Sequence, residues 1–192
     1  MHRHLPLMRA LACLALLACA GAYAEVSERL DTTYYEVGVQ RGRALAPQIR
    51  AATPVRTDGR PFFGHTDWQV NWRFRWSQDG AGVCRFTSVN VELRSTITLP
   101  RLRGADARQS AAFERFMPAL REHEMGHHRL AQEAARAIDN ELRNFAAQRD
   151  CATLESQANA AGARLLERYR DKERQYDRDT DHGKSQGAWL EG

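Results

Sequence analysis

Two histidines and a glutamate in the segment His123-Glu124-Met125-Gly126-His127 have the types and the spacing that zinc chemistry requires. On a helix, residues four apart project from the same face, so both imidazoles can bind one zinc ion at about 2.0–2.1 Å. Glu124 is rotated about the helix axis relative to His123, so it can hold a water on the metal instead of binding the metal itself. The motif therefore predicts a helix that carries a zinc site.

The sequence around the two histidines is that of a buried helix face. His123 and His127 fall between Leu120 and Leu130 on one apolar stripe. A buried imidazole without a partner is costly, whereas a metal ligand satisfies one ring nitrogen. Gly126 costs about 1 kcal/mol relative to alanine inside a helix, and it lets another segment or a substrate approach closely. Two alternatives stay open, namely core histidines bonded to the backbone and a purely structural zinc site.

A third protein ligand has to come from another part of the chain. A second helix follows the first, and at 1.5 Å per residue such a hairpin returns to the level of His127 near residue 175. His182 follows directly and is the first choice for the third ligand. Glu141 is weaker, because it lies on the same uninterrupted helix as the histidine pair. The aspartates that arrive beside His182 are Asp177, Asp179 and Asp181.

Three residues receive supporting positions around this predicted metal site, namely His128, Tyr176 and Asp181. His128 is rotated by about 100° from His127 and is expected behind the ligands or against a substrate. His128 or Tyr176 could donate a hydrogen bond to the oxyanion of the reaction. His65, in the loop before an aromatic strand, could be a group on the substrate side or an ordinary surface residue, and the second interpretation is preferred.

These residues predict hydrolysis by a metal-activated water. Zinc held by His123, His127 and His182 lowers the pKa of its bound water towards 7. Glu124 takes the proton as the water attacks a peptide carbonyl, and then passes it to the leaving amine.

The elements that position the motif divide into a strand-rich part, residues 32–100, and a helical hairpin, residues 105–176. Apolar residues in the second part recur at intervals of three or four, which indicates long helices. After Tyr176 the chain is rich in Asp, Thr and Gly and is expected to be irregular. Residues 25–192 are predicted to form a single α+β domain in which an antiparallel sheet packs on the long helical hairpin.

The clearest strand covers residues 68–76. Its aromatic and apolar residues alternate with polar ones, which indicates one buried face and one exposed face. Asp79-Gly80 marks a turn, and a return strand is expected from Val83 to about Pro100. The residues assigned to the buried face are Trp68, Val70, Trp72, Phe74 and Trp76.

Residues 1–24 have the pattern of a secretory signal peptide. Arg3 and Arg9 precede a short apolar run, and Ala22-Tyr23-Ala24 offers a cleavage site. Cys19 gives a lesser alternative, a lipid anchor. No later segment is apolar enough to span a membrane. The sequence therefore predicts export to the periplasm or the extracellular space.

The two cysteines outside the predicted signal peptide are Cys84 and Cys151. An even pair in an exported protein predicts one disulfide. This bridge would place the start of the return strand at the bend of the helical hairpin. Residues 93–99 would then border the zinc cleft, where an extended peptide could pair by strand addition.

An ordered set of segments resembles a known family. Over most of residues 32–183 the chain is similar to secreted bacterial zinc-dependent proteases that are catalogued as a domain of unknown function. The resemblance implies an exported peptidase and supports the segment from Thr180 to Gly183 as part of the site, but it names no substrate. The segments that carry it are Tyr34-Tyr35-Glu36-Val37, Thr66-Asp67-Trp68-Gln69-Val70-Asn71-Trp72, Cys84, Thr98-Leu99-Pro100, His123-Glu124-Met125-Gly126-His127 and Thr180-Asp181-His182-Gly183.

The predicted function is a zinc-dependent peptidase that acts on a peptide or protein substrate. An amidase acting on cell-wall peptide would use the same site. The main alternative is a non-catalytic envelope protein, with or without zinc, that binds a partner through its aromatic sheet. Without residues 1–24 the formal net charge falls from +4 to +2, because Arg3 and Arg9 are lost, and the remaining charges are interspersed. This distribution argues against a nucleic-acid partner.

Overall fold

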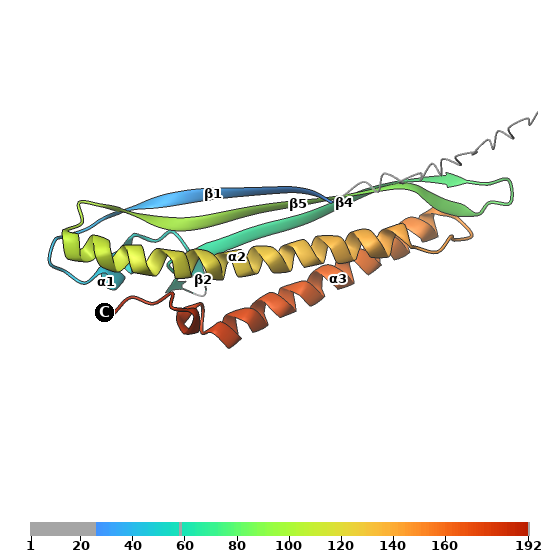
Figure 1. The fold of residues 1–192 in the computed structure, drawn as a ribbon. Coiled ribbons are helices and arrows are strands. Elements are labelled where there is room, and N and C mark those ends of the chain that lie inside the picture. The colour runs from blue at the N-terminus through green and yellow to red at the C-terminus, as the bar shows by residue number, and fades with distance from the viewer. Residues whose placement is uncertain (1–25, 58, 192) are drawn as a thin grey trace, which may run out of the picture.

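The protein is described by a computed structural model that covers residues 26–57 and 59–191. Three long strands form one layer, and two long helices run along one side of it (Figure 1). The predicted signal peptide, residues 1–24, and the alternative lipid anchor at Cys19 lie outside the described residues. In chain order the elements are β1 (Ser27–Gly38), α1 (Leu45–Ala52), β2 (Arg56–Thr57), β3 (Arg60–Pro61), β4 (His65–Gln78), β5 (Cys84–Arg103), α2 (Ala107–Arg143), α3 (Cys151–Thr180) and the 3-10 helix η1 (Lys184–Gln186).

Strand β5 is the centre of the sheet, between β1 and β4. β4 pairs with it antiparallel, as the predicted hairpin requires, whereas β1 pairs with it parallel over its whole length. β1 and β5 run in the same direction because the chain reverses twice between them, once before β4 and once after it. The predicted α+β class is confirmed, and the sheet is mixed rather than wholly antiparallel.

The central place of β5 makes the predicted peptide shelf wrong. Residues 93–99 pair with residues 28–34 of β1 on one side and, up to residue 98, with residues 65–70 of β4 on the other. The backbone groups at both edges of this segment are therefore already used. An extended peptide cannot add to it as a new strand.

The period-two pattern of β4 and β5 places alternate side chains against the helices. A register shift between Arg75 and Trp76 leaves Thr87 of β5 without a partner in β4 near the tip of the hairpin. Trp76 is 46% exposed there, so its assignment to the buried face is wrong. The buried inward residues of β5 are Val89, Val91, Leu93, Ser95, Ile97 and Leu99.

Helix α2 is a single helix of 37 residues that continues through Pro118. The Asp106 carboxylate accepts a hydrogen bond from the Gln109 backbone, and the Gln109 side chain accepts one from the Asp106 backbone. This capping box satisfies two donors that a helix start leaves unpaired. Ile138 and Leu142 on its buried stripe are fully enclosed, so packing against the sheet fixes the orientation of the motif further along the same face.

The predicted disulfide is present and closes the bend between α2 and α3. It joins Cys84, the first residue of β5, to Cys151, the first residue of α3. The backbone of Cys84 also pairs with that of Gln148 in the bend. The bridge thus ties the helical hairpin to the tip of the strand hairpin.

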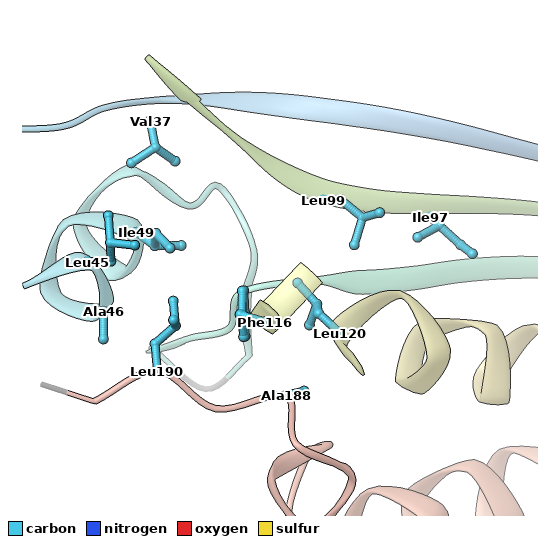
Figure 2. Packing of buried hydrophobic residues seen from close by; sticks show 10 residues of the cluster. All are labelled: Val37, Leu45, Ala46, Ile49, Ile97, Leu99, Phe116, Leu120, Ala188 and Leu190. Atoms are coloured by element: carbon cyan, nitrogen blue, oxygen red, sulfur yellow. The ribbon is translucent and has the colours of Figure 1, made fainter. Parts of the chain in front are cut away.

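Helix α3 runs to Thr180, one turn beyond its predicted end at Tyr176. The predicted irregular tail contains η1, and it then joins a buried apolar cluster through Ala188 and Leu190. Figure 2 shows both residues in the cluster that includes Ile49 of α1 and Leu120 of α2. No helix in the described part of the chain combines the length and the apolar character that crossing a membrane demands.

Candidate metal centre

Helix α2 buries the three residues of the motif that were singled out for chemistry. His123, Glu124 and His127 are only 4%, 3% and 6% exposed. Leu120, one turn earlier, belongs to the apolar cluster of Figure 2. The two imidazoles are one helical turn apart and their rings are edge to face at 4.9 Å. The two rings are therefore enclosed by their neighbours and packed against each other.

Asp177 of α3 meets the two histidines, as the length of the helical hairpin predicts for this part of the chain. Its Oδ1 atom is 3.3 Å from His123 Nε2 and 3.1 Å from His127 Nε2. The two Nε2 atoms are themselves 3.3 Å apart. These three atoms form a nearly equilateral triangle, and a group of this composition could hold a metal ion.

The size of the triangle matches that of a metal site. Ligand atoms in a tetrahedral zinc site with bonds of about 2.05 Å are about 3.3 Å from one another. Three potential ligand atoms that converge at this spacing would leave a fourth position for water or substrate, as catalytic zinc sites do. Two imidazoles and one carboxylate also suit iron, so the composition alone does not select the metal.

His182 lies beside this triangle rather than within it. Helix α3 continues past Asp177 and ends in left-handed residues, with φ of 48° at Asp181 and 51° at His182. This turn places His182 Nδ1 3.5 Å from Asp177 Oδ2 and its ring 4.9 Å from that of Phe62. Its role as a metal ligand stays a prediction, and its present contact is with the carboxylate that faces the histidines.

The other acidic residues considered as ligands lie farther away. Asp181 has a side chain that is 69% exposed and is 3.8 Å from the ammonium group of Lys184. Asp179 is exposed and accepts a hydrogen bond from Gln175. Glu141 is exposed on α2, about 21 Å along the helix from the histidines at 1.5 Å per residue. None of these residues belongs to the group that could hold a metal.

The second nitrogen of each imidazole also faces an acceptor. His123 Nδ1 is 3.0 Å from Gln186 Oε1, and His127 Nδ1 is 3.3 Å from Glu173 Oε1. The Trp68 indole donates to the same Glu173 oxygen at 3.0 Å. The hydrogen bond at Nδ1 of His123 favours the tautomer whose Nε2 lone pair points into the triangle, an arrangement typical of histidine ligands. His127 Nδ1 has no hydrogen-bond partner among the described residues, so Glu173 acts on it through its charge. Tertiary contacts of this kind have no local signal in the sequence.

Tyr176 fills the space that Gly126 leaves open. Its ring stacks on His123 at 5.2 Å with 13° between the planes, and its hydroxyl donates to the His123 carbonyl at 3.3 Å. A Cβ atom at Gly126 would lie 2.1 Å from that hydroxyl, so the prediction that another segment approaches Gly126 is confirmed. The hydroxyl also hydrogen-bonds with Gln186. Its position behind His123 suits holding the ring, whereas the role of oxyanion donor stays untested.

His128 projects to another side of α2 from His127. Its Nδ1 atom is 3.0 Å from Ser95 Oγ, and its Nε2 atom is 2.9 Å from Glu28 Oε1. Gln132 donates to the same Glu28 oxygen at 2.7 Å. This buried network links α2 to β5 and to the edge strand β1. It gives His128 a place in the packing of the sheet, away from the group formed with Asp177.

Glu124 is held by the start of β4. Thr66 Oγ1 is 2.8 Å from Glu124 Oε2 and 2.9 Å from the Glu124 carbonyl. A Cβ atom at Gly64 would lie 2.7 Å from Glu124 Oε1, so only glycine leaves room for the carboxylate there. Burial raises the pKa of Glu124 and outweighs the opposing effects of His127, the Thr66 hydrogen bond, His123 and His65. A carboxyl group whose pKa is raised from its ordinary range is a better proton acceptor for catalysis near neutral pH.

The protonation states of His127 and Asp177 depend on one another. Burial lowers the pKa of His127, but the hydrogen bond with Asp177, the carboxylate of Glu173 and the negative charges nearby outweigh it and raise the pKa to about 9. Burial likewise raises the pKa of Asp177, but hydrogen bonds with His123 and His127 hold it well below its usual range. A divalent cation would take the place of the proton between these groups, because zinc binds neutral imidazole and ionised carboxylate.

A cavity of about 480 Å³ opens in front of the group. His123, Glu124, His127 and Asp177 line one part of it, and His65 lines it as well, although the sequence assigned His65 to the ordinary surface. The other walls come from the loop before β4, from α1 and from the C-terminal segment, through residues such as Phe62, Phe63, Arg50, Lys184 and Trp189. A chain segment of a substrate could therefore reach the buried carboxylate and imidazoles.

Comparison with known proteins adds a family to this geometry. A protein-family model described as a bacterial protein of unknown function (DUF922) matches residues 32–183. This range includes the motif on α2, the end of α3 and the start of β4, which lines the cavity. Comparison with curated proteins and with solved structures found no match.

Proposed function

The chain belongs to the DUF922 family of bacterial proteins of unknown function, and we propose that it is a zinc-dependent peptidase. The observation that carries this proposal is the triangle of His123, His127 and Asp177 atoms, with sides of 3.1–3.3 Å. We propose that these three residues hold zinc and that His182 either joins them or orients Asp177. The disulfide is consistent with export, and we propose the periplasm or the extracellular space as the location.

In this proposal each residue has a defined task. Bound zinc would supply the positive charge that activates water and polarises a peptide carbonyl. Glu124 accepts a proton from the attacking water and delivers it to the leaving nitrogen, so that a carboxylic acid and an amine result. Thr66 holds the Glu124 carboxylate in place. Gln186, Glu173 and Tyr176 fix the imidazole rings.

A buried Glu124 that lines the cavity favours catalysis over the alternative of a non-catalytic zinc-binding envelope protein. Such a protein would need the histidines and Asp177, but it would gain nothing from a carboxylate that is 3% exposed and therefore costly to bury. A general base that the substrate can reach explains why the carboxylate lies there. The same site would serve an amidase that acts on cell-wall peptide, which differs only in its substrate.

The test compares Glu124→Gln with Glu122→Gln. Glu122 is on the same helix but exposed, where it pairs with Arg129. Both variants should bind one zinc ion per chain by elemental analysis. Glu124→Gln should lose about 10²–10⁴-fold of the hydrolysis of a fluorogenic peptide library, and Glu122→Gln should keep it. Equal hydrolysis by the two variants, or wild-type protein without zinc, would overturn the proposal.

The third ligand is tested by Asp177→Asn and His182→Gln. Loss of a ligand should weaken zinc binding more than the 10–100-fold that loss of an outer partner typically causes. We therefore expect the larger loss for Asp177→Asn, measured by competition with a fluorescent chelator. A larger loss for His182→Gln would assign the third position to His182 instead.

A further inference from the structure

One wall of the cavity, formed by residues of α1, of the loop before β4 and of the C-terminal segment, combines cationic groups with aromatic rings. The guanidinium carbon of Arg50 lies 5.4 Å from the centre of the Phe63 ring and 5.9 Å from that of Trp189. The ammonium nitrogen of Lys184 lies 4.4 Å from the Trp189 ring. All four residues line the cavity that contains the proposed metal ligands. This wall thus presents an aromatic surface with two positive charges close to Trp189.

Trp189 is held in this exposed position by its neighbours. Its side chain is 47% exposed, yet Ala188 and Leu190 on either side of it are only 5% and 6% exposed. Both belong to the apolar cluster with α1 and α2 (Figure 2). The backbone of Ala188 donates to the Gly183 carbonyl at 3.0 Å. The exposure of Trp189 therefore does not arise from a loose chain end, and it leaves apolar surface available to a ligand.

Arg50 and Lys184 differ from Arg174, the third cationic residue of the cavity, in how they are paired with carboxylates. Arg50 pairs with no carboxylate of residues 26–57 and 59–191, and Lys184 has only the exposed Asp181, at 3.8 Å. Arg174 also lines the cavity, but its guanidinium pairs with Glu167 and Asp171 on α3. A half-buried guanidinium without a counter-charge is a receptor for an anionic group.

We propose that Arg50, Lys184 and Trp189 form a subsite for a carboxylate on the peptide substrate. The carboxylate would be either the C-terminal one or that of an acidic side chain, with apolar atoms beside it against Trp189. The inference rests on the proposed function and names the substrate class, namely acidic or short, free-ended peptides. The remainder of the peptide would extend from this wall towards Glu124.

Matched peptides test the subsite by binding rather than by hydrolysis. The probes are an acetylated tetra-alanine with a free carboxylate, its C-terminal amide, and two amides that carry one internal Glu or Gln. Each is titrated calorimetrically into the Glu124→Gln protein with and without zinc. At least one of the two acidic probes should bind about tenfold or more tightly than its neutral partner, as expected for a charge-assisted hydrogen bond. The acidic probe that shows the preference identifies the source of the carboxylate.

Charge-matched variants separate the subsite from general electrostatics and from direct binding of the carboxylate to zinc. Arg50→Gln should reduce the acidic-to-neutral preference to below about threefold, Lys184→Gln should reduce it less, and Arg174→Gln should keep it. Lys184 is exposed, so Lys184→Gln keeps the test valid if Arg50→Gln folds poorly. Equal binding of acidic and neutral probes, or a preference that survives both substitutions, would overturn the subsite.

The outcome is independent of the peptidase test. A preference for carboxylate that depends on Arg50, in a protein that cleaves none of the peptides, would support the subsite and refute the proposed function. Efficient cleavage without any such preference would do the reverse.

Discussion

The two halves of α3 are attached to the molecule in different ways. In the first half, Leu154, Ala158, Ala161 and Gly162 are buried, and Cys151 is bonded covalently to Cys84. From residue 163 to residue 179 no side chain is fully buried. Leu165, Leu166 and Tyr169 are partly buried against the apolar cluster of the sheet and α2. Beyond them the attachment is polar and aromatic, through the contacts that Glu173, Tyr176 and Asp177 make with Trp68 and the two histidines.

This difference shows how one helix can serve both stability and binding. Apolar burial and a disulfide do not depend on pH or on a ligand, so the first half of α3 keeps the hairpin together. The second half holds charges that need a counter-charge, which either a proton or a metal can provide. Metal binding should therefore act mainly on the second half.

The largest effect should come from removing the disulfide. In Cys84→Ser/Cys151→Ser the free energy of unfolding should fall by about 4 kcal/mol, because the bridge closes a loop across 67 positions in sequence. Denaturant unfolding measures this loss. Zinc affinity should change by no more than about twofold, since Asp177 lies about 39 Å along α3 from Cys151. A zinc affinity that falls in parallel with stability would show that the two halves act as one unit.

The next largest effect concerns His127 of α2, which faces the charged second half of α3, in the metal-free protein. The folded-state pKa of His127 is raised to about 9 from an ordinary value of 6.5. Its contribution to stability is therefore complete below pH 6.5 and is lost as the pH rises through 9, an effect of about 3 kcal/mol. Chelator-treated protein unfolded by denaturant at pH 6 and at pH 9 should show this decline.

The control for this pH effect is His127→Gln, which should abolish most of the decline. Zinc-loaded wild-type protein should gain stability from the metal as the pH rises from 6 towards 8, because zinc competes with the imidazole proton. An equal decline in wild type and in His127→Gln would place the pH-sensitive group elsewhere.

Regular features of the fold follow from the sequence because they depend on repeats. The alternation along β4 and the three-to-four spacing along α2 predict the elements, and the fixed rise of a helix predicts that the chain returns to His127 near residue 175. The bulge near the hairpin tip and the parallel pairing of β1 depend on register and on direction, which no local pattern encodes.

The candidate site likewise contains residues that the sequence predicts and contacts that it does not. His123, Glu124 and His127 are recognisable because their spacing is local to one helix. The approach of Asp177 rather than His182 to the histidines depends on where α3 ends, and that end lies in a left-handed turn one helical turn beyond the predicted one. Boundaries of helices are the least predictable feature of a sequence.

The smallest effects should come from two glycine-to-alanine changes, one in each region of the comparison. A Cβ atom at Gly162 would lie 2.9 Å from the Trp72 ring, next to the first half of α3, and one at Gly126 would meet Tyr176 of the second half. In each case alanine gains about 1 kcal/mol in helix propensity but adds an overpacking cost of about 1–3 kcal/mol, so both variants should lose roughly 1 kcal/mol of stability.

Zinc affinity should then separate these two variants. Gly126→Ala displaces Tyr176 from the His123 ring and should weaken zinc binding by about tenfold, whereas Gly162→Ala should change it by no more than about twofold. Tyr176→Ala in the Gly126→Ala background should cause little further loss, because both changes remove the same stacking contact. Additive losses in this double variant would mean that Gly126 affects the metal group by a route other than Tyr176. Equal zinc affinities of Gly126→Ala and Gly162→Ala would mean that the ring behind His123 does not contribute to holding the ligand.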